Sequence, residues 1–398
     1  MLEKIMGRGW SSKVGGRGII SFYRKVFWDS PAPRNLNWGW NYGSLLGFTL
    51  VIQIIRGLIL SLFYVPGTME DAFNSVQFIE RDVNGGWLLR GIHMRGASSF
   101  FLYLYCHVGR GLYFGSYDNK KTWRMGVAIL VLCMLEGFLG YVLPAGQMSY
   151  WGATVICNFL TVVPLVGETL LEYVLGGYRV SGLTLKRFFV VHFLAPFLII
   201  ILVIFHLVWA HEKGASNPLG VRPNEWSTLA PGFLYKDLIG LFLAEARAII
   251  IISRFSWVFQ EPTNSIIANP IYTPVHIQPE WYFLFAYSIL RCVDTKTGGV
   301  ILILLSVLAL LVPIIWSRVG EERSYRGGLQ FYPLCKIWYW MFVGTFLGLT
   351  FLGSQPPEEP FKILRRYLTV SYFSFFLLMP FIKRFDNWLL RVFIGANS

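Results

Sequence analysis

Long apolar stretches separated by short polar loops run through almost the whole chain. Stretches of about 20 apolar residues are long enough to cross a bilayer as helices. The pattern therefore predicts an all-α polytopic membrane protein with eight transmembrane helices. The predicted spans are 42–64, 88–114, 125–143, 188–210, 235–256, 299–317, 337–353 and 367–383.

Composition agrees with this pattern. The 398 residues are 55% hydrophobic and only 14% charged, which disfavours a soluble globular protein. The fifth span is unusual because Glu245 and Arg247 lie in its middle. Charge inside a membrane is costly and usually marks a position that faces protein or serves a function.

The net charge of +13 is better explained by membrane topology than by nucleic-acid binding. With eight spans, both termini lie on one side, where the loops carry about twice as many Lys and Arg residues as the opposite loops. This bias places both termini on the cytoplasmic or matrix side. The basic segment 1–30 lacks a long apolar core, so it is not a cleaved secretory signal. It is either an amphipathic helix on the membrane surface or a solvated arm.

Two pairs of histidines share one spacing. His93 and His107 are 14 residues apart, and so are His192 and His206. In an α-helix, 14 residues rise about 21 Å and end about 40° short of four full turns, so each pair shares one helix face. If the two helices run antiparallel, His93 faces His192 and His107 faces His206.

Facing imidazoles on bundle helices are suited to bind b-type haem. A single histidine on an apolar helix is more often a hydrogen-bonded core residue, but two pairs with equal spacing favour two haems. None of the five cysteines forms a CxxC or CxxCH motif, so covalent haem attachment and zinc binding are both unsupported. They are best interpreted as buried apolar residues: Cys106, Cys133, Cys157, Cys292 and Cys335.

Glycines repeat the histidine spacing on two other spans. Gly43 and Gly57 are 14 residues apart, as are Gly126 and Gly140. A flat macrocycle in a helical bundle needs neighbouring helices without side chains at its level, which glycine provides. Each glycine pair by itself could instead serve close helix packing.

Cations lie near the histidines, where haem propionates would need them. Arg90 lies one turn before His93, Arg110 lies one turn after His107, and Lys186 with Arg187 precedes His192. Arginine binds carboxylates in a bidentate manner. The alternative is that these cations only anchor the helices at the membrane surface.

A third cluster, PVHIQPEWYF at 274–283, contains two prolines that prevent a continuous helix. It carries Glu280 among aromatic residues, where an apolar setting would raise the pKa of the carboxyl and allow proton exchange near neutrality. Alternatively, Glu280 caps the helix that follows. A further titratable group comprises His211, Lys236 and Asp237, which could also be solvated loop charges.

These features together resemble the cytochrome b family, the core haem subunits of ubiquinol–cytochrome c oxidoreductase (respiratory complex III). The resemblance extends from about Pro31 to the last span. One chain with a spacing of 14 in both pairs favours the mitochondrial or proteobacterial type, and the moderate length favours the mitochondrial type. The segments that carry the resemblance are WNYGSLLGFTLVIQI (40–54), FNSVQFIERDVNGGWLLR (73–90), GASSFFLYLYCHVGRGLYFGSY (96–117), GYVLPAGQMSYWGATVICNF (140–159), HFLAPF, HLVWAHEKG and PEWYFLFAYSILR (279–291).

The resemblance implies a low-potential haem b at His93 and His192 on the outer face, and a high-potential haem b at His107 and His206 on the matrix face. It also implies two sites for ubiquinol and ubiquinone. The outer, quinol-oxidising site would comprise Met134, Phe138, Tyr141, Met148, Gly152, Pro279, Glu280, Tyr282 and Phe283. The inner, quinone-reducing site would comprise Asn41, Ser44, His211, Lys236 and Asp237.

The resemblance further implies a multi-pass protein of the mitochondrial inner membrane, working by the Q cycle. Implied partners are a Rieske-type iron–sulfur protein, a cytochrome c-type subunit, other complex III subunits, membrane lipid and a second copy in a homodimeric complex. The expected organisation is a basic extension (1–30), a haem-binding four-helix bundle (31–215) and a C-terminal domain with four further helices (216–398).

Some residues depart from the family pattern. Arg56 precedes Gly57, where a small residue is usual, so its side chain must reach a propionate, a backbone carbonyl or the surface. Ala145 replaces a usual tryptophan, which is expected to enlarge the outer pocket, and Ala215 follows His211 where serine is usual.

Three rival interpretations remain at the level of sequence. A di-haem anchor of another quinone-linked oxidoreductase would share the haems but needs no second quinone pocket. A secondary transporter could use the histidines and intramembrane charges as proton relays. A purely structural membrane subunit would not account for the paired histidine and glycine spacings.

Overall fold

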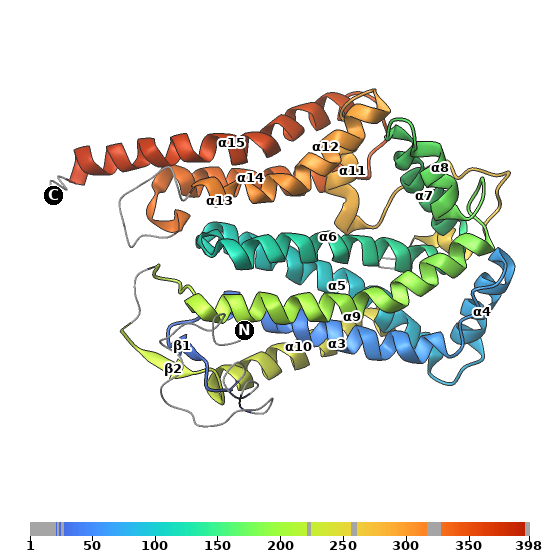
Figure 1. The fold of residues 1–398 in the computed structure, drawn as a ribbon, viewed down its shortest axis with the longest axis horizontal. Helices are drawn as coiled ribbons and strands as arrows, with labels where there is room; N and C mark the ends of the chain where they lie inside the picture. The colour runs from blue at the N-terminus through green and yellow to red at the C-terminus, as the bar shows by residue number, and fades with distance from the viewer. Residues whose placement is uncertain are drawn as a thin grey trace.

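The computed structural model describes residues 28–220, 224–255, 261–316 and 328–394, together with residues 21 and 24. It is an elongated bundle of roughly parallel and antiparallel helices (Figure 1). Two short antiparallel strands, β1 (Pro31–Pro33) and β2 (Trp226–Thr228), pair at one end of the bundle. Most of the basic extension 1–30 lies outside the described residues.

The first half of the chain forms a four-helix bundle. Its helices are α3 (Tyr42–Ser61), α5 (Gly86–Tyr113), α6 (Lys120–Val142) and α9 (Gly182–Lys213). Helix α3 packs along α5, and α6 packs along α9 (Figure 1). The two pairs of helices face each other and enclose the candidate site.

Helices from the second half lie on either side of this bundle. Helix α10 (Gly232–Arg254) packs against α3 and α5. The remaining helices form a separate layer with α14 and α15 side by side (Figure 1). They are α11 (Leu284–Leu290), α12 (Lys296–Leu308), α13 (Pro313–Trp316), α14 (Pro333–Gly353) and α15 (Phe361–Ile394).

Each of the eight predicted spans coincides with helical structure. The sixth is interrupted by a 3-10 turn, η7 (Ala309–Leu311), before Pro313, which has no backbone N–H to continue the helix. Among the described residues, six helices are long and apolar enough to cross a membrane: α3, α6, α9, the α12–α13 segment, α14 and α15. Helices α5 and α10, which carry several charged side chains, are outside this set.

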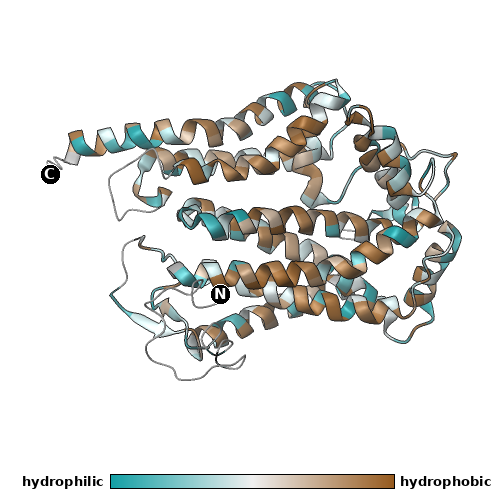
Figure 2. Ribbon diagram, viewed as in Figure 1, coloured by the Kyte–Doolittle hydropathy of each residue, from teal (hydrophilic) through white to brown (hydrophobic). Residues whose placement is uncertain are grey.

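The chain is therefore a multi-pass membrane protein in which apolar side chains cover much of the helix surface (Figure 2). Many of these apolar side chains are exposed, as a lipid environment allows.

Three short helices that the apolar pattern does not predict cap one end of the bundle (Figure 1). They are α4 (Met69–Arg81), α7 (Gln147–Cys157) and α8 (Gly167–Leu175). Helix α4 starts with a capping box, in which Thr68 and Asp71 satisfy each other's backbone N–H groups. These helices are too short to cross a bilayer, so a search for long apolar stretches misses them.

Helix α15 holds both ends of α14 through two buried charges. Asp386 accepts hydrogen bonds from the backbone N–H groups of Leu334 and Cys335, at 3.1 and 2.8 Å, at the start of α14. At the other end, Arg365 donates to the carbonyl oxygen of Leu352 at 3.2 Å and to those of residues 355 and 356, which follow α14. An anion at the helix N-terminus and a cation at the C-terminus both match the helix dipole.

Candidate functional site: two stacked histidine pairs

The four histidines lie on the two long helices α5 and α9, which run antiparallel. His93 faces His192 and His107 faces His206, and in both pairs the ring centroids are 6.3 Å apart. The expected juxtaposition of the rings is therefore present in the structure. The shared spacing of 14 residues places one pair near each end of the bundle.

Each of the four glycines lies against one of the four histidine rings. A Cβ atom added to any of them would lie about as close to the ring as atoms can approach, or closer. The distances from that Cβ to the Cε1 atom of the ring are 3.1 Å for Gly57 and His93, 3.3 Å for Gly43 and His107, 3.2 Å for Gly126 and His206, and 2.7 Å for Gly140 and His192. Helix α3 thus makes room for the histidines of α5, and α6 makes room for those of α9.

The two pairs fit a haem iron. Bonds from a metal to imidazole nitrogen are about 2 Å long, so an iron between two rings would separate their centroids by about 6 Å. The rings of His93 and His206 each interact with the backbone of a neighbouring residue, Gln53 and Thr122 respectively, as expected for imidazoles held in one orientation. Facing imidazoles held in this way are suited to bind a metal between them.

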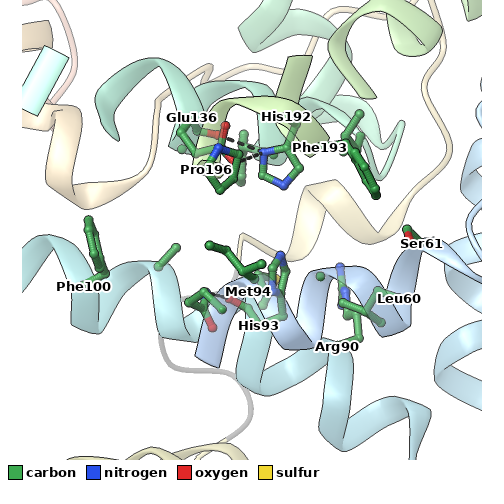
Figure 3. Close-up of a pocket in the computed structure, with 18 of the residues that line it drawn as sticks. Leu60, Ser61, Arg90, His93, Met94, Phe100, Glu136, His192, Phe193 and Pro196 are labelled. Carbon is green, nitrogen blue, oxygen red and sulfur yellow. Dashed lines mark hydrogen bonds and ion pairs between the residues drawn. The ribbon is translucent and has the colours of Figure 1, made fainter. Parts of the chain in front are cut away.

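A carboxylate contacts one of the four histidines. Glu136, on α6, places Oε1 2.7 Å from Nδ1 of His192, and its backbone oxygen lies 3.3 Å from the same nitrogen (Figure 3). This leaves the other ring nitrogen, Nε2, free. Glu136 is not among the predicted site residues, although a carboxylate in the apolar stretch 125–143 often marks a functional position.

A cavity of about 260 Å³ joins the first histidine pair to the turn that contains Glu280. It is lined by residues of α3, α5, α6 and α9, and Figure 3 shows the side chains around its histidine end. Gly57, Gly140, Tyr141 and Tyr282 also line it. One continuous space therefore connects the candidate haem site to the candidate outer quinol site.

The three arginines expected near haem propionates have different surroundings. Arg90 forms an ion pair with Glu80 of α4. Arg110 lies with Nη2 3.2 Å from Nδ1 of His107 and with its guanidinium 5.4 Å from the ring centroid of Trp40. Arg187 is exposed and donates to the backbone oxygen of Tyr173 on α8. Arg90 also lines the cavity at the first histidine pair.

Glu280, in the turn formed by the PEWY segment (279–282), also lines this cavity. Glu280 precedes the 3-10 helix η6 (Trp281–Phe283), and its side chain makes no capping hydrogen bond, which argues against the helix-cap interpretation. Burial, reinforced by the negative charge of Glu261, raises the pKa of Glu280 to about 7. The carboxyl group can therefore gain and lose a proton near neutral pH.

Aromatic packing fixes the turn against α5. The ring of Tyr282 stacks on Phe101 with centroids 4.1 Å apart and planes 3° from parallel. Tyr105 donates from its hydroxyl to the backbone oxygen of Tyr282. Phe283 packs edge-on against Phe101 at 5.6 Å. These contacts hold Glu280 in place without using its own side chain.

The other residues expected in the outer site lie nearby on α6 and α7. Met134 and Phe138 are partly buried on α6, Met148 is buried on α7, and Gly152 has open space beside its Cα atom. Pro279 is partly buried in the turn itself. Ala145 is fully buried and is not among the residues that line the cavity, and the expected enlargement of the outer pocket stays a prediction.

At the opposite end of the bundle, three of the expected inner-site residues form one cluster. Asn41 and Ser44 both donate to Oδ1 of Asp237, at 2.5 and 2.6 Å. Lys236 points elsewhere and donates to the backbone oxygen of Leu36 at 3.1 Å. His211 lies in the last turn of α9, at the same end of the bundle (Figure 1).

The unusual charges in the membrane region are partnered. Arg56, on α3, forms an ion pair with Glu245 of α10 at 2.5 Å, which is none of the three destinations expected for it. Arg247 donates to the hydroxyl of Tyr103 at 2.9 Å. The two charges in the middle of α10 therefore face α3 and α5 rather than lipid.

A multi-pass helical membrane protein with two stacked pairs of facing histidines has the architecture of a di-haem electron carrier. Two family models match the chain: Cytochrome b/b6/petB over residues 27–214 and Cytochrome b(C-terminal)/b6/petD over residues 267–373. A solved structure titled "Hyperthermophilic respiratory Complex III" contains a similar chain with 30% identity and a TM-score of 0.84. The match covers 92% of this chain and 97% of the other. The chain belongs to the cytochrome b family.

Proposed function

We propose that this chain is the cytochrome b subunit of a respiratory complex III and transfers electrons from ubiquinol to ubiquinone across the membrane. The observation that carries the proposal is the pair of facing histidine couples on α5 and α9, each with ring centroids 6.3 Å apart. The similarity to a chain of a hyperthermophilic complex III supports it.

The four histidines would hold two non-covalent haem b groups, which supply one-electron transfer when bound. His93 and His192 would ligate the low-potential haem, and His107 and His206 the high-potential haem. The glycines of α3 and α6 keep the rings in position, because any side chain there would displace them. Arg90, Arg110 and Arg187 would bind propionates.

At the outer site, the chain's own residues would bind ubiquinol and take its proton. Glu280 would accept a proton from the quinol hydroxyl, since its pKa of about 7 allows uptake and release near neutrality. Tyr282 and the surrounding apolar side chains would exclude water. A Rieske-type iron–sulfur protein would dock near the α7 surface around Gly152.

At the inner site, the cluster around Asp237 would bind ubiquinone and supply protons for its reduction. Asn41 and Ser44 hold the Asp237 carboxylate by two short hydrogen bonds, so it is positioned to interact with a ligand. His211, at the same end of α9, would be a second proton donor. Electrons would pass from quinol at the outer site to quinone at the inner site, where protons are taken up. This electron transfer would move charge across the membrane.

All eight helical spans would cross the bilayer, including α5 and α10, whose charges face protein. We place the protein in the mitochondrial inner membrane with both termini on the matrix side, as the Lys and Arg bias suggests. In support, β1 and the C-terminal end of α15 lie at the same end of the bundle (Figure 1). The same proposal includes the division of the chain into 1–30, 31–215 and 216–398. It also includes a cytochrome c-type subunit as a partner and a homodimeric complex.

The test is a potentiometric titration of the purified complex followed by visible difference spectra. Two b-type components with separate midpoint potentials are expected. His192→Ala should remove one component. The matched control is His276→Ala, because His276 is exposed and its Nε2 atom lies 3.0 Å from the backbone oxygen of Ser354. This variant should retain both components. A folded complex without a b-type spectrum would contradict the proposal.

A further inference from the structure

Glu136 is a partly buried carboxylate that the proposed function does not use. It lies on α6 one turn before Gly140, and it contacts His192 through the ring nitrogen Nδ1 at 2.7 Å (Figure 3). Building on the proposed function, we propose that Glu136 is a positioning residue for His192 that lowers the midpoint potential of the haem held by His93 and His192.

The geometry fixes which nitrogen of His192 faces the metal. With Nδ1–H donating to the Glu136 carboxylate, Nε2 keeps its lone pair and points toward the facing ring of His93. A second acceptor, the backbone oxygen of Glu136 at 3.3 Å, lies on the same side of the ring. Both contacts hold the imidazole in one tautomer and one orientation.

The carboxylate also changes the electronic character of the ligand. A hydrogen bond from Nδ1–H to a carboxylate makes the imidazole a stronger electron donor, as in other metal sites with a carboxylate–histidine pair. A stronger donor and a nearby negative charge both favour ferric over ferrous iron. The haem bound there should therefore be harder to reduce.

This arrangement occurs in one of the two pairs. Among the described residues, no carboxylate contacts His93, His107 or His206. The corresponding neighbour in the second pair is a cation, since Arg110 lies 3.2 Å from Nδ1 of His107. The Glu136 carboxylate would lower the midpoint potential of the haem at His93 and His192, and the Arg110 guanidinium would raise that of the haem at His107 and His206. This difference favours electron transfer from the first haem to the second.

A purely structural role does not account well for Glu136. Its second carboxylate oxygen, Oε2, is buried without a hydrogen-bond partner among the described residues. A half-satisfied carboxylate in an apolar helix reduces stability, so packing alone does not explain a glutamate at this position.

The experiment compares midpoint potentials of both haems in the intact complex carrying Glu136→Gln. Glutamine keeps the size of the side chain and an oxygen that can accept from Nδ1–H, but it removes the charge. If this weakens the preference for ferric iron about tenfold, the midpoint of the His93/His192 component rises by about 59 mV. The electron paramagnetic resonance g-values of that ferric haem should change as well.

Two further variants separate the ligand effect from a packing effect. Glu136→Asp retains a carboxylate, so it should raise the midpoint potential of the His93/His192 component less than Glu136→Gln does. Glu168→Gln, on α8, removes an exposed carboxylate and should leave both potentials unchanged. The His107/His206 component should stay constant throughout and serves as an internal reference.

Several outcomes would overturn the inference. Unchanged potentials and g-values in Glu136→Gln would do so, as would an equal shift in Glu136→Gln and Glu136→Asp. If both Glu136 variants lose the haem while Glu168→Gln keeps it, Glu136 serves only packing. If Glu136→Gln alone loses the haem, the result supports a role of Glu136 in positioning His192. A wild-type complex without two b-type components would instead contradict the proposed function.

Discussion

At the scale of single residues, the candidate site depends on the absence of side chains as much as on their presence. Gly140 has the least room of the four glycines, with 2.7 Å between an added Cβ and the Cε1 atom of His192. Such a contact is shorter than real Cβ atoms show, and the surrounding helices are packed. The histidine ring, rather than a neighbouring backbone, is therefore what requires glycine at this position.

We expect Gly140→Ala to displace the His192 ring and to weaken or abolish binding of the haem at the first pair. Overpacking of this kind costs about 1–3 kcal/mol of stability. Visible difference spectra and a thermal unfolding curve of the complex would measure both effects. Gly47→Ala is the matched control, because an added Cβ there meets nothing within 4 Å; equal losses in the two variants would contradict the argument.

Glu280 gives a prediction about pH. Since only the ionised carboxylate can accept a proton, quinol oxidation should rise with pH through about 7, which is the pKa of this group. Glu280→Gln should slow turnover and remove that inflection while both haems stay bound. Turnover that is unchanged in this variant would exclude the proposed proton role.

A second substitution tests the cause of that pKa. The charge of Glu261 helps to raise the pKa of Glu280, so Glu261→Gln should lower it and move the inflection to lower pH. Initial rates measured over a range of pH would detect the displacement. An inflection that stays in place would mean that burial alone sets the pKa.

At the scale of elements, buried charges join helices that are distant in sequence. The ion pair between Arg56 and Glu245 links α3 to α10, and Asp386 with Arg365 links the ends of α14 to α15. In each case one charge comes from a helix that the apolar pattern predicts well. What the pattern cannot provide is the partner, because the partner depends on how each helix is rotated and packed.

The link between α3 and α10 can be tested by separate and joint removal of its charges. Removing one partner, as in Arg56→Met or Glu245→Met, leaves an uncompensated charge and should cost about 3–5 kcal/mol. The double variant Arg56→Met/Glu245→Met removes both charges and should lose less stability than either single variant. Thermal unfolding of the complex would measure the interaction; additive losses would indicate that the two side chains do not stabilise each other.

At the scale of the whole molecule, the positions of the long helices could be predicted from the sequence better than the side-chain contacts between them. Helical structure at all eight predicted segments, six of them candidate membrane spans among the described residues, follows from local composition. The two histidine pairs follow from a period of 14 residues, which an α-helix converts directly into position. The short helices α4, α7 and α8 were missed because they are too short to appear as long apolar stretches. Glu136 was missed because its contact with His192 spans two helices and has no periodic signal.

The destination of Arg56 was predicted wrongly for a related reason. The prediction rested on the neighbours of Arg56 along the chain, whereas its actual partner, Glu245, comes from a helix distant in sequence. The inner cluster was predicted in part: Asn41, Ser44 and Asp237 are together, whereas Lys236 contacts a backbone oxygen instead.

The spacing of 14 residues between histidines also sets an electrical distance. A rise of about 21 Å along the helix is roughly two thirds of a hydrocarbon core of about 30 Å. An electron passing between the two pairs would then cross most of the voltage drop, with about 1.6 kcal/mol of work per 100 mV. A membrane voltage of 100 mV should thus redistribute one electron between the pairs by about 15-fold. Visible spectra of vesicles under an imposed voltage would measure this redistribution. The ratio of the two reduced haems would then report the electric field across the membrane.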